Sequence, residues 1–128
     1  MTRPYHYIEV ERRGDVFCTR LRRSQLDEPM VHELAAELRH LITEESCRKL
    51  ALSLGPEAPQ CLYSVFLAKL ITLQRMLRER EGELVLCHVS PPVRSIFATC
   101  CLDQLFHFEP DYDAAVAYWK KENHESHE

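Results

Sequence analysis

The segment that most constrains the fold is the short apolar run from Glu83 to Val89, which follows Gly82. It reads Glu-Leu-Val-Leu-Cys-His-Val, so most of its side chains are hydrophobic and several of these are adjacent. A short run that is apolar at successive positions is typical of a strand buried on both faces. Such a strand needs other strands beside it and helices on both sides of the sheet. We therefore predict that this segment is a central strand of an α/β sheet.

Four further segments have the residue patterns of β-strands. They are rich in β-branched, aromatic or alternating apolar residues, and most of them end at turn-forming residues. These segments are residues 5–11, 15–21, 47–54 and 105–108. Because Arg12-Arg13-Gly14-Asp15 joins the first two with turn chemistry, we predict a hairpin at the N-terminus.

Apolar residues recur at helical spacing in four other segments. We predict helices at about residues 28–44, 64–81, 90–100 and 113–120. Asp27 ahead of Pro29, and Ser90 ahead of Pro91-Pro92, supply an N-cap and prolines in the first turn. The order ββαβαβαβα then predicts right-handed crossovers. The expected fold is α/β, a mixed sheet of four to five strands with an antiparallel N-terminal edge and about four helices packed on it.

The chain is long enough for one hydrophobic core. It has 128 residues, of which 45% are hydrophobic, and no interior stretch rich in Gly, Pro or Ser divides it. We therefore predict a single domain over residues 1–120. Residues 121–128 are charged or polar and contain no apolar side chain, so we predict a disordered tail there.

Charge and hydropathy exclude several classes of partner. Sixteen basic and twenty acidic residues give a formal net charge of -4, so no overall positive field attracts nucleic acid. No apolar run reaches the length of a membrane-spanning helix, and Met1–His6 lacks the apolar core of a signal peptide. We therefore expect a cytoplasmic protein that neither binds nucleic acid nor inserts into a membrane.

In the absence of a recognisable export signal, we interpret the cysteines as reduced, small core residues. They are Cys18, Cys47, Cys61, Cys87, Cys100 and Cys101. The metal-ligating candidates Cys87-His88, Cys100-Cys101 and His107 lack the spacing of a zinc site, so we predict no metal and a packing role for Cys100-Cys101. The three glycines are too scattered for a phosphate-binding loop, and we predict no cofactor.

Two segments carry a resemblance to a known family. The first reads Ser-Val-Phe-Leu-Ala-Lys-Leu-Ile-Thr-Leu at 64–73, and the second reads Gly-Glu-Leu-Val-Leu-Cys-His-Val-Ser-Pro-Pro-Val-Arg at 82–94. Leu26-Asp27, residues 102–106 and residues 113–117 add weaker matches in the same order. Over about residues 7–118 the chain resembles the STAS domain, the fold of the anti-sigma factor antagonists of bacterial partner-switching systems. The family commonly has Asp where this chain has Ser53 and Tyr63.

The resemblance implies a non-catalytic binding module that binds a kinase-type anti-sigma factor, as a monomer or weak homodimer. It places Ser64 on the serine that such a serine kinase phosphorylates. It also implies a partner-binding surface made of the loop at 55–63, the start of the second helix and the turn before the third. The residues expected to contact the partner are Tyr63, Ser64, Val65, Phe66, Ala68, Ser90 and Arg94.

Further interpretations of the same residues stay open. Ser64 has the position and chemistry of a helix cap, a role that requires no phosphorylation. The whole domain could be an unphosphorylated STAS subunit of a signalling scaffold or of a lipid-transport ATPase complex. An enzyme is the third option, although no Gly-x-Ser-x-Gly turn surrounds Ser64.

Overall fold

The computed structural model describes residues 5–23, 25–55 and 64–125. These residues form strands and helices in the order ββαβαβαβα, as predicted. The elements are β1 (Ile8–Arg13), β2 (Val16–Leu21), α1 (Glu28–Glu44), β3 (Lys49–Ser53), α2 (Ser64–Glu79), β4 (Glu83–Cys87), α3 (Pro91–Thr99), β5 (His107–Glu109) and α4 (Tyr112–Glu125).

The strands form one mixed sheet in the order β1-β2-β3-β4-β5. The pair β1 and β2 is antiparallel, and every other pair is parallel, so the predicted antiparallel N-terminal edge is confirmed. The apolar run at 83–89 forms β4, which lies between β3 and β5 as an interior strand. The middle strand of the five is β3.

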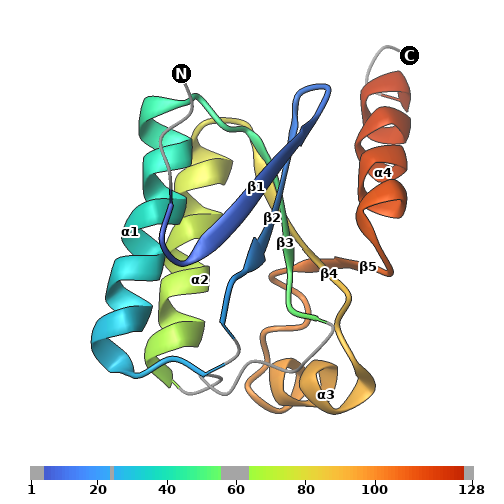
Figure 1. Ribbon diagram of the computed structural model, residues 1–128. Helices are drawn as coiled ribbons and strands as arrows, with labels where there is room; N and C mark the ends of the chain where they lie inside the picture. The colour runs from blue at the N-terminus through green and yellow to red at the C-terminus, as the bar shows by residue number, and fades with distance from the viewer. Residues whose placement is uncertain (1–4, 24, 56–63, 126–128) are drawn as a thin grey trace.

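Helices cover the sheet from both sides (Figure 1). On one face, leucines of β3 and β4 pack with the apolar sides of α1 and α2 in the larger core. On the other face, Ala51, Val85 and Cys87 pack against Ala115 and Trp119 of α4. The alternation of side chains along each strand therefore delivers apolar groups to two separate cores.

Local signals fix several ends of these elements. Asp27 caps α1 by accepting the Met30 N–H at 3.0 Å, as predicted from its position before Pro29. Ser90 is the N-cap of α3, although its side chain makes no capping hydrogen bond. The short β5 begins at His107, two residues later than predicted, because Phe106 turns into the core beside Phe97.

The last helix is longer than predicted. It continues to Glu125, so the expected disordered tail overlaps α4 over residues 121–125. The segment 121–125 contains no proline or glycine, and its lysine and glutamate residues favour helix. The absence of apolar residues therefore does not mark the end of α4. Residues 126–128 lie outside the described part of the chain.

In the described ranges, no helix combines the length and the apolar character that crossing a membrane requires.

A fully buried polar side chain joins α2 to the sheet. Gln74 of α2 is fully buried, and its amide oxygen accepts the Leu84 N–H at 2.8 Å. Its amide nitrogen donates to the carbonyl oxygens of Leu84 at 3.3 Å and Leu105 at 3.0 Å. Gln74 therefore joins α2 to β4 and to the segment that leads into β5.

We predict that Gln74→Leu destabilises the protein by about 2–4 kcal/mol, because it preserves volume but leaves buried backbone groups without partners. The free energy of unfolding from urea denaturation measures this effect. Gln104→Leu, at an exposed position, is the matched control and should change stability by about 0.5 kcal/mol or less. Equal effects of the two substitutions would contradict the role of Gln74.

Candidate functional site

The topology gathers the candidate residues at one end of the sheet. Each parallel strand is followed by a segment that turns back, so α2 begins near the carboxyl end of β3 and α3 begins near that of β4 (Figure 1). The carboxyl ends of parallel strands are where open α/β sheets bind ligands. The described residues of the sequence-predicted surface lie at this end.

Ser64 is the first residue of α2, and it is exposed. Ala68, one turn later, is also exposed, whereas Val65 is half-buried. The first turn of α2 contains no acidic side chain. The N–H groups at the start of a helix carry partial positive charge, so this position can accept a phosphate group without local repulsion.

Phe66 does not belong to the exposed surface. Its side chain is 1% exposed and packs in the larger core, because the third position of α2 faces the sheet. The expectation that Phe66 contacts a partner is therefore corrected: the ring supports the first turn from beneath. Tyr63 and loop residues 56–63 lie outside the described residues.

Ser90 and Arg94 mark the start of α3. The Ser90 carbonyl oxygen accepts the Arg94 N–H at 2.9 Å, and Ser90 is partly exposed. The Arg94 side chain is exposed, and its guanidinium carbon lies 4.4 Å from the centre of the Phe108 ring. This cation–π contact holds Arg94 over β5 while its charge stays accessible to solvent.

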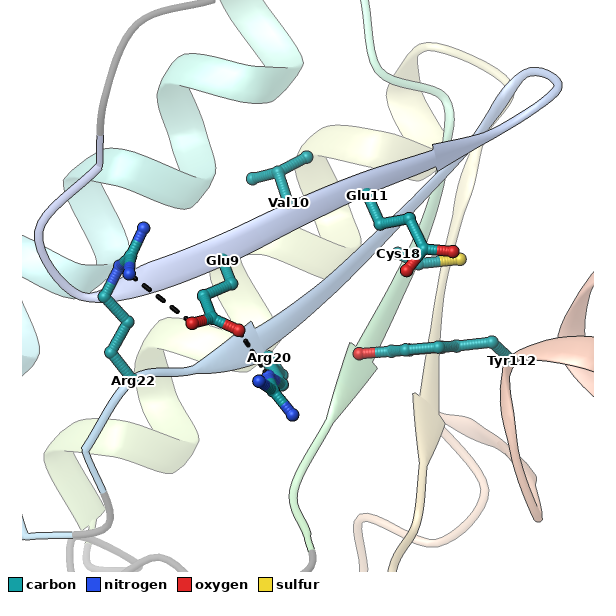
Figure 2. Close-up of a pocket in the computed structure, with 7 residues that line it drawn as sticks. All are labelled: Glu9, Val10, Glu11, Cys18, Arg20, Arg22 and Tyr112. Atoms are coloured by element: carbon teal, nitrogen blue, oxygen red, sulfur yellow. Dashed lines mark hydrogen bonds and ion pairs between the residues drawn. The ribbon is translucent and has the colours of Figure 1, made fainter.

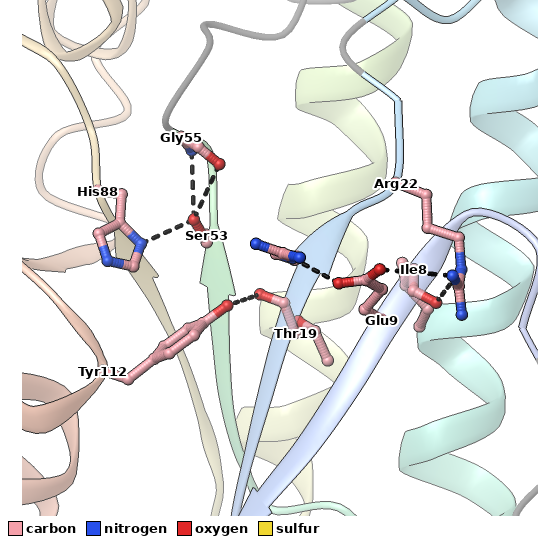
Figure 3. A network of polar contacts seen from close by, with 9 residues as sticks. Ile8, Glu9, Thr19, Arg22, Ser53, Gly55, His88 and Tyr112 are labelled. Atoms are coloured by element: carbon pink, nitrogen blue, oxygen red, sulfur yellow. Dashed lines mark hydrogen bonds and ion pairs between the residues drawn. The ribbon is translucent and has the colours of Figure 1, made fainter.

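A second cluster at this end of the sheet was not predicted. Ser53 Oγ lies 2.7 Å from His88 Nδ1 and accepts the Gly55 N–H at 3.2 Å (Figure 3). His88 has a φ of 56°, a left-handed conformation that is uncommon for residues other than glycine. A Cβ at Gly55 would lie 2.8 Å from the His88 carbonyl oxygen, so the close approach of the two segments requires glycine there.

Tyr112, at the start of α4, closes the cluster from the other side. Its ring packs edge-to-face on His88 with centres 5.2 Å apart, and its hydroxyl donates to the Thr19 carbonyl oxygen at 2.7 Å. Burial raises the pKa of Tyr112 well above its ordinary value. Tyr112 therefore acts as a neutral hydrogen-bond donor that ties α4 to β2.

The candidate metal ligands are dispersed. Among the described residues, no group of three or more His, Cys, Asp or Glu side chains is arranged to hold a metal ion. The prediction that Cys100 and Cys101 pack internally is wrong, because both are exposed. They follow the last turn of α3, where the chain reverses, whereas Phe97 before them faces the core.

The other described cysteines are buried, as predicted, and carry free thiols. Burial raises the pKa of Cys18 to about 11 and the pKa of Cys47 and Cys87 to about 12. Cys61 lies outside the described residues.

Comparison with known proteins identifies the family. The sequence pattern that defines the STAS domain matches residues 7–115, which is most of the chain. The protein therefore belongs to the STAS domain family.

Solved structures share the fold. An anti-sigma-factor antagonist (STAS) domain protein from Planctomyces limnophilus is 21% identical, with a TM-score of 0.71 over 86% of this chain and 95% of that one. The Bacillus cell fate determinant SpoIIAA in its phosphorylated form is 18% identical, with a TM-score of 0.65 over 87% and 98%. A chain from the stressosome, a signal integration and transduction hub, is 18% identical, with a TM-score of 0.63 over 88% and 96%.

Thiol accessibility provides a test of this arrangement. In a Cys61→Ser background at about pH 8, we predict that Cys100 and Cys101 react rapidly with a disulfide reagent, while Cys18, Cys47 and Cys87 react only on unfolding. The buried thiols are slow because access is blocked and because a pKa of about 11 or 12 leaves them protonated. The absorbance of the thiolate released from the reagent gives the number of cysteines that react in each phase. Loss of the rapid phase in Cys100→Ser/Cys101→Ser is expected, and its persistence would contradict the burial pattern.

Proposed function

We propose that the protein is a non-catalytic regulatory module that binds a kinase-type anti-sigma factor and is switched by phosphorylation at Ser64. Binding of the unphosphorylated protein would occupy the anti-sigma factor and release the sigma factor or a similar output. In this proposal the protein acts in the cytoplasm, as a monomer or weak homodimer.

The observation that carries the proposal is the position of Ser64, exposed at the first residue of α2. The hydroxyl is accessible to a kinase, and the helix end tolerates the added charge of about −2. The phosphate would therefore act mainly on the partner. It would repel the partner's acidic groups and fill the space around the hydroxyl that the partner would otherwise occupy. The fold is also shared with a protein solved in a phosphorylated form.

The proposed contact surface combines the start of α2 with the start of α3. Ala68 extends the exposed face of Ser64 by one turn, and Val65 contributes a partly exposed apolar edge. Ser90 and Arg94 add a hydroxyl and a charge at the neighbouring helix. A small apolar centre with a polar rim is the usual composition of a regulated protein–protein interface.

A structural subunit of a signalling assembly is the second candidate. The observation that favours it is the fold shared with a stressosome chain. In that case the same surface would make permanent contacts, and Ser64 would only begin its helix. The two candidates differ in whether charge at Ser64 controls binding.

The partner for this test is the cognate anti-sigma factor encoded by the adjacent genes. We predict that Ser64→Asp weakens binding to it by at least about tenfold. Ser64→Ala should bind nearly as well as the unaltered protein. A charge added at the interface lowers the magnitude of the binding free energy more than the loss of one exposed hydroxyl does. Calorimetric titration gives the three affinities, and incubation with the partner and ATP should add phosphate to Ser64 but not to the Ala variant.

Ser46→Asp is the matched control, because Ser46 is an exposed serine before β3 at the opposite end of the sheet. Its left-handed φ of 56° tolerates Asp, and it should leave affinity unchanged. Equal affinities for Ser64→Ala and Ser64→Asp would reject the switch and favour the structural subunit.

A further inference from the structure

The face of the sheet that carries α4 is only partly covered. The helix packs on β3, β4 and β5 and on Val16 and Cys18 of β2, and the rest of the outer face of β1 and β2 lies beside it (Figure 1). A row of residues crosses this face near the carboxyl ends of the parallel strands, because Glu9 of β1 is paired with Arg20 of β2, and Arg20 with Ser53 of β3. Tyr112, at the start of α4, lies next to this row and lines the same hollow as Arg20 and Ser53.

Two neighbouring hollows occupy this gap. The smaller has a volume of about 230 Å³ and is lined by Arg20, Ser53, Gly55, His88 and Tyr112. The larger has a volume of about 510 Å³ and continues over β1 and β2 (Figure 2). Arg20 and Tyr112 line both hollows, so they stand at the junction.

Arg20 is oriented by its neighbour. Its Nε donates to Glu9 at 2.5 Å, and its side chain is 54% exposed. Its two terminal nitrogens make no hydrogen bond to another described residue, so they remain available to a ligand. Arg22 lies 3.5 Å from the same Glu9 carboxylate. Two guanidinium groups thus share one carboxylate, and positive charge is left in excess. Glu11 does not cancel it, because it pairs with Arg13 at 2.7 Å.

His88 supplies a second ligand group across the smaller hollow. Its Nδ1 lies 2.7 Å from Ser53 Oγ, and its Nε2 has no hydrogen-bond partner within the described ranges. The left-handed φ of 56° places the ring against Tyr112 instead of along the strand direction. Strained backbone of this kind is found preferentially at binding sites.

We propose that the smaller hollow binds the phosphate group of a small phosphomonoester. The terminal nitrogens of Arg20 would bind two phosphate oxygens, and the His88 ring would face a third. With Ser53 Oγ–H donating to Nδ1, the proton of the His88 ring is on Nε2, and donors on two sides of the hollow suit a tetrahedral anion. The volume is below the roughly 300–1,000 Å³ of pockets for drug-sized ligands, so the hollow suits the phosphate group, and a larger organic part would extend into the larger hollow. This site is separate from Ser64 and does not depend on the proposed switch.

NMR titration of the full chain with glycerol 3-phosphate, inorganic phosphate and acetate at constant ionic strength tests the proposal. We expect saturable shifts of the Gly55 and His88 amides and of the Arg20 Nε–H with both phosphates, and weaker binding of acetate. Arg20→Gln should lower phosphate affinity at least about tenfold, because the bidentate contact is lost. His88→Asn, which suits a left-handed backbone, should lower it severalfold.

Arg39→Gln is the control, because it removes the same charge from an exposed position on α1. It should leave phosphate affinity unchanged. Three results would each overturn the assignment. They are shifts that do not saturate, equal phosphate affinities for Arg20→Gln and Arg39→Gln, and acetate binding as tight as phosphate binding. Spectra recorded without ligand show whether each variant is folded. If Arg20→Gln does not fold, the affinity of His88→Asn still tests the proposal.

Discussion

The structure depends on the burial of β3 and β4 on both faces. Leu50, Leu52, Leu84 and Leu86 are fully buried on the side of α1 and α2, and the intervening residues are buried under α4. Two parallel strands with no polar face need a helical crossover between them, and that helix is α2. The crossover places Ser64 at the carboxyl end of the sheet. The exposed start of α2 is therefore a direct consequence of how the core is covered.

The same constraint separates two regions with different chemistry at that end of the sheet. On the side of α1 and α2, exposed and half-buried residues at the start of α2 belong to the surface that we propose for a protein partner. On the side of α4, the helix covers only part of the sheet and leaves hollows lined by Arg20, His88 and Tyr112. Ser53 lies at the boundary, since it ends β3 and contacts His88. The proposed partner surface and the proposed phosphate site therefore occupy different parts of one small domain.

Periodicity and turn residues were sufficient to predict the order of elements and the antiparallel edge, because these follow from local pattern. The contact of Ser53 with His88 was missed, since it joins residues 35 positions apart through strand register. Its signal was present: both residues end or follow neighbouring parallel strands. Phe66 was misplaced because a family match indicates a helix position but not the direction of its side chain. Gln74 gave no signal, because one polar residue on an apolar helix face has no periodic pattern.

The proposed function requires the protein to bind its partner through the carboxyl end of the sheet, around Ser64. Amide hydrogen exchange of the protein, free and bound to the cognate anti-sigma factor, measures this contact directly. We expect slower exchange on binding in residues 64–68 and at Ser90, Val93 and Arg94, with no change in β1 or α4. Protection confined to β1 or α4, with the start of α2 unchanged, would contradict the proposed binding surface.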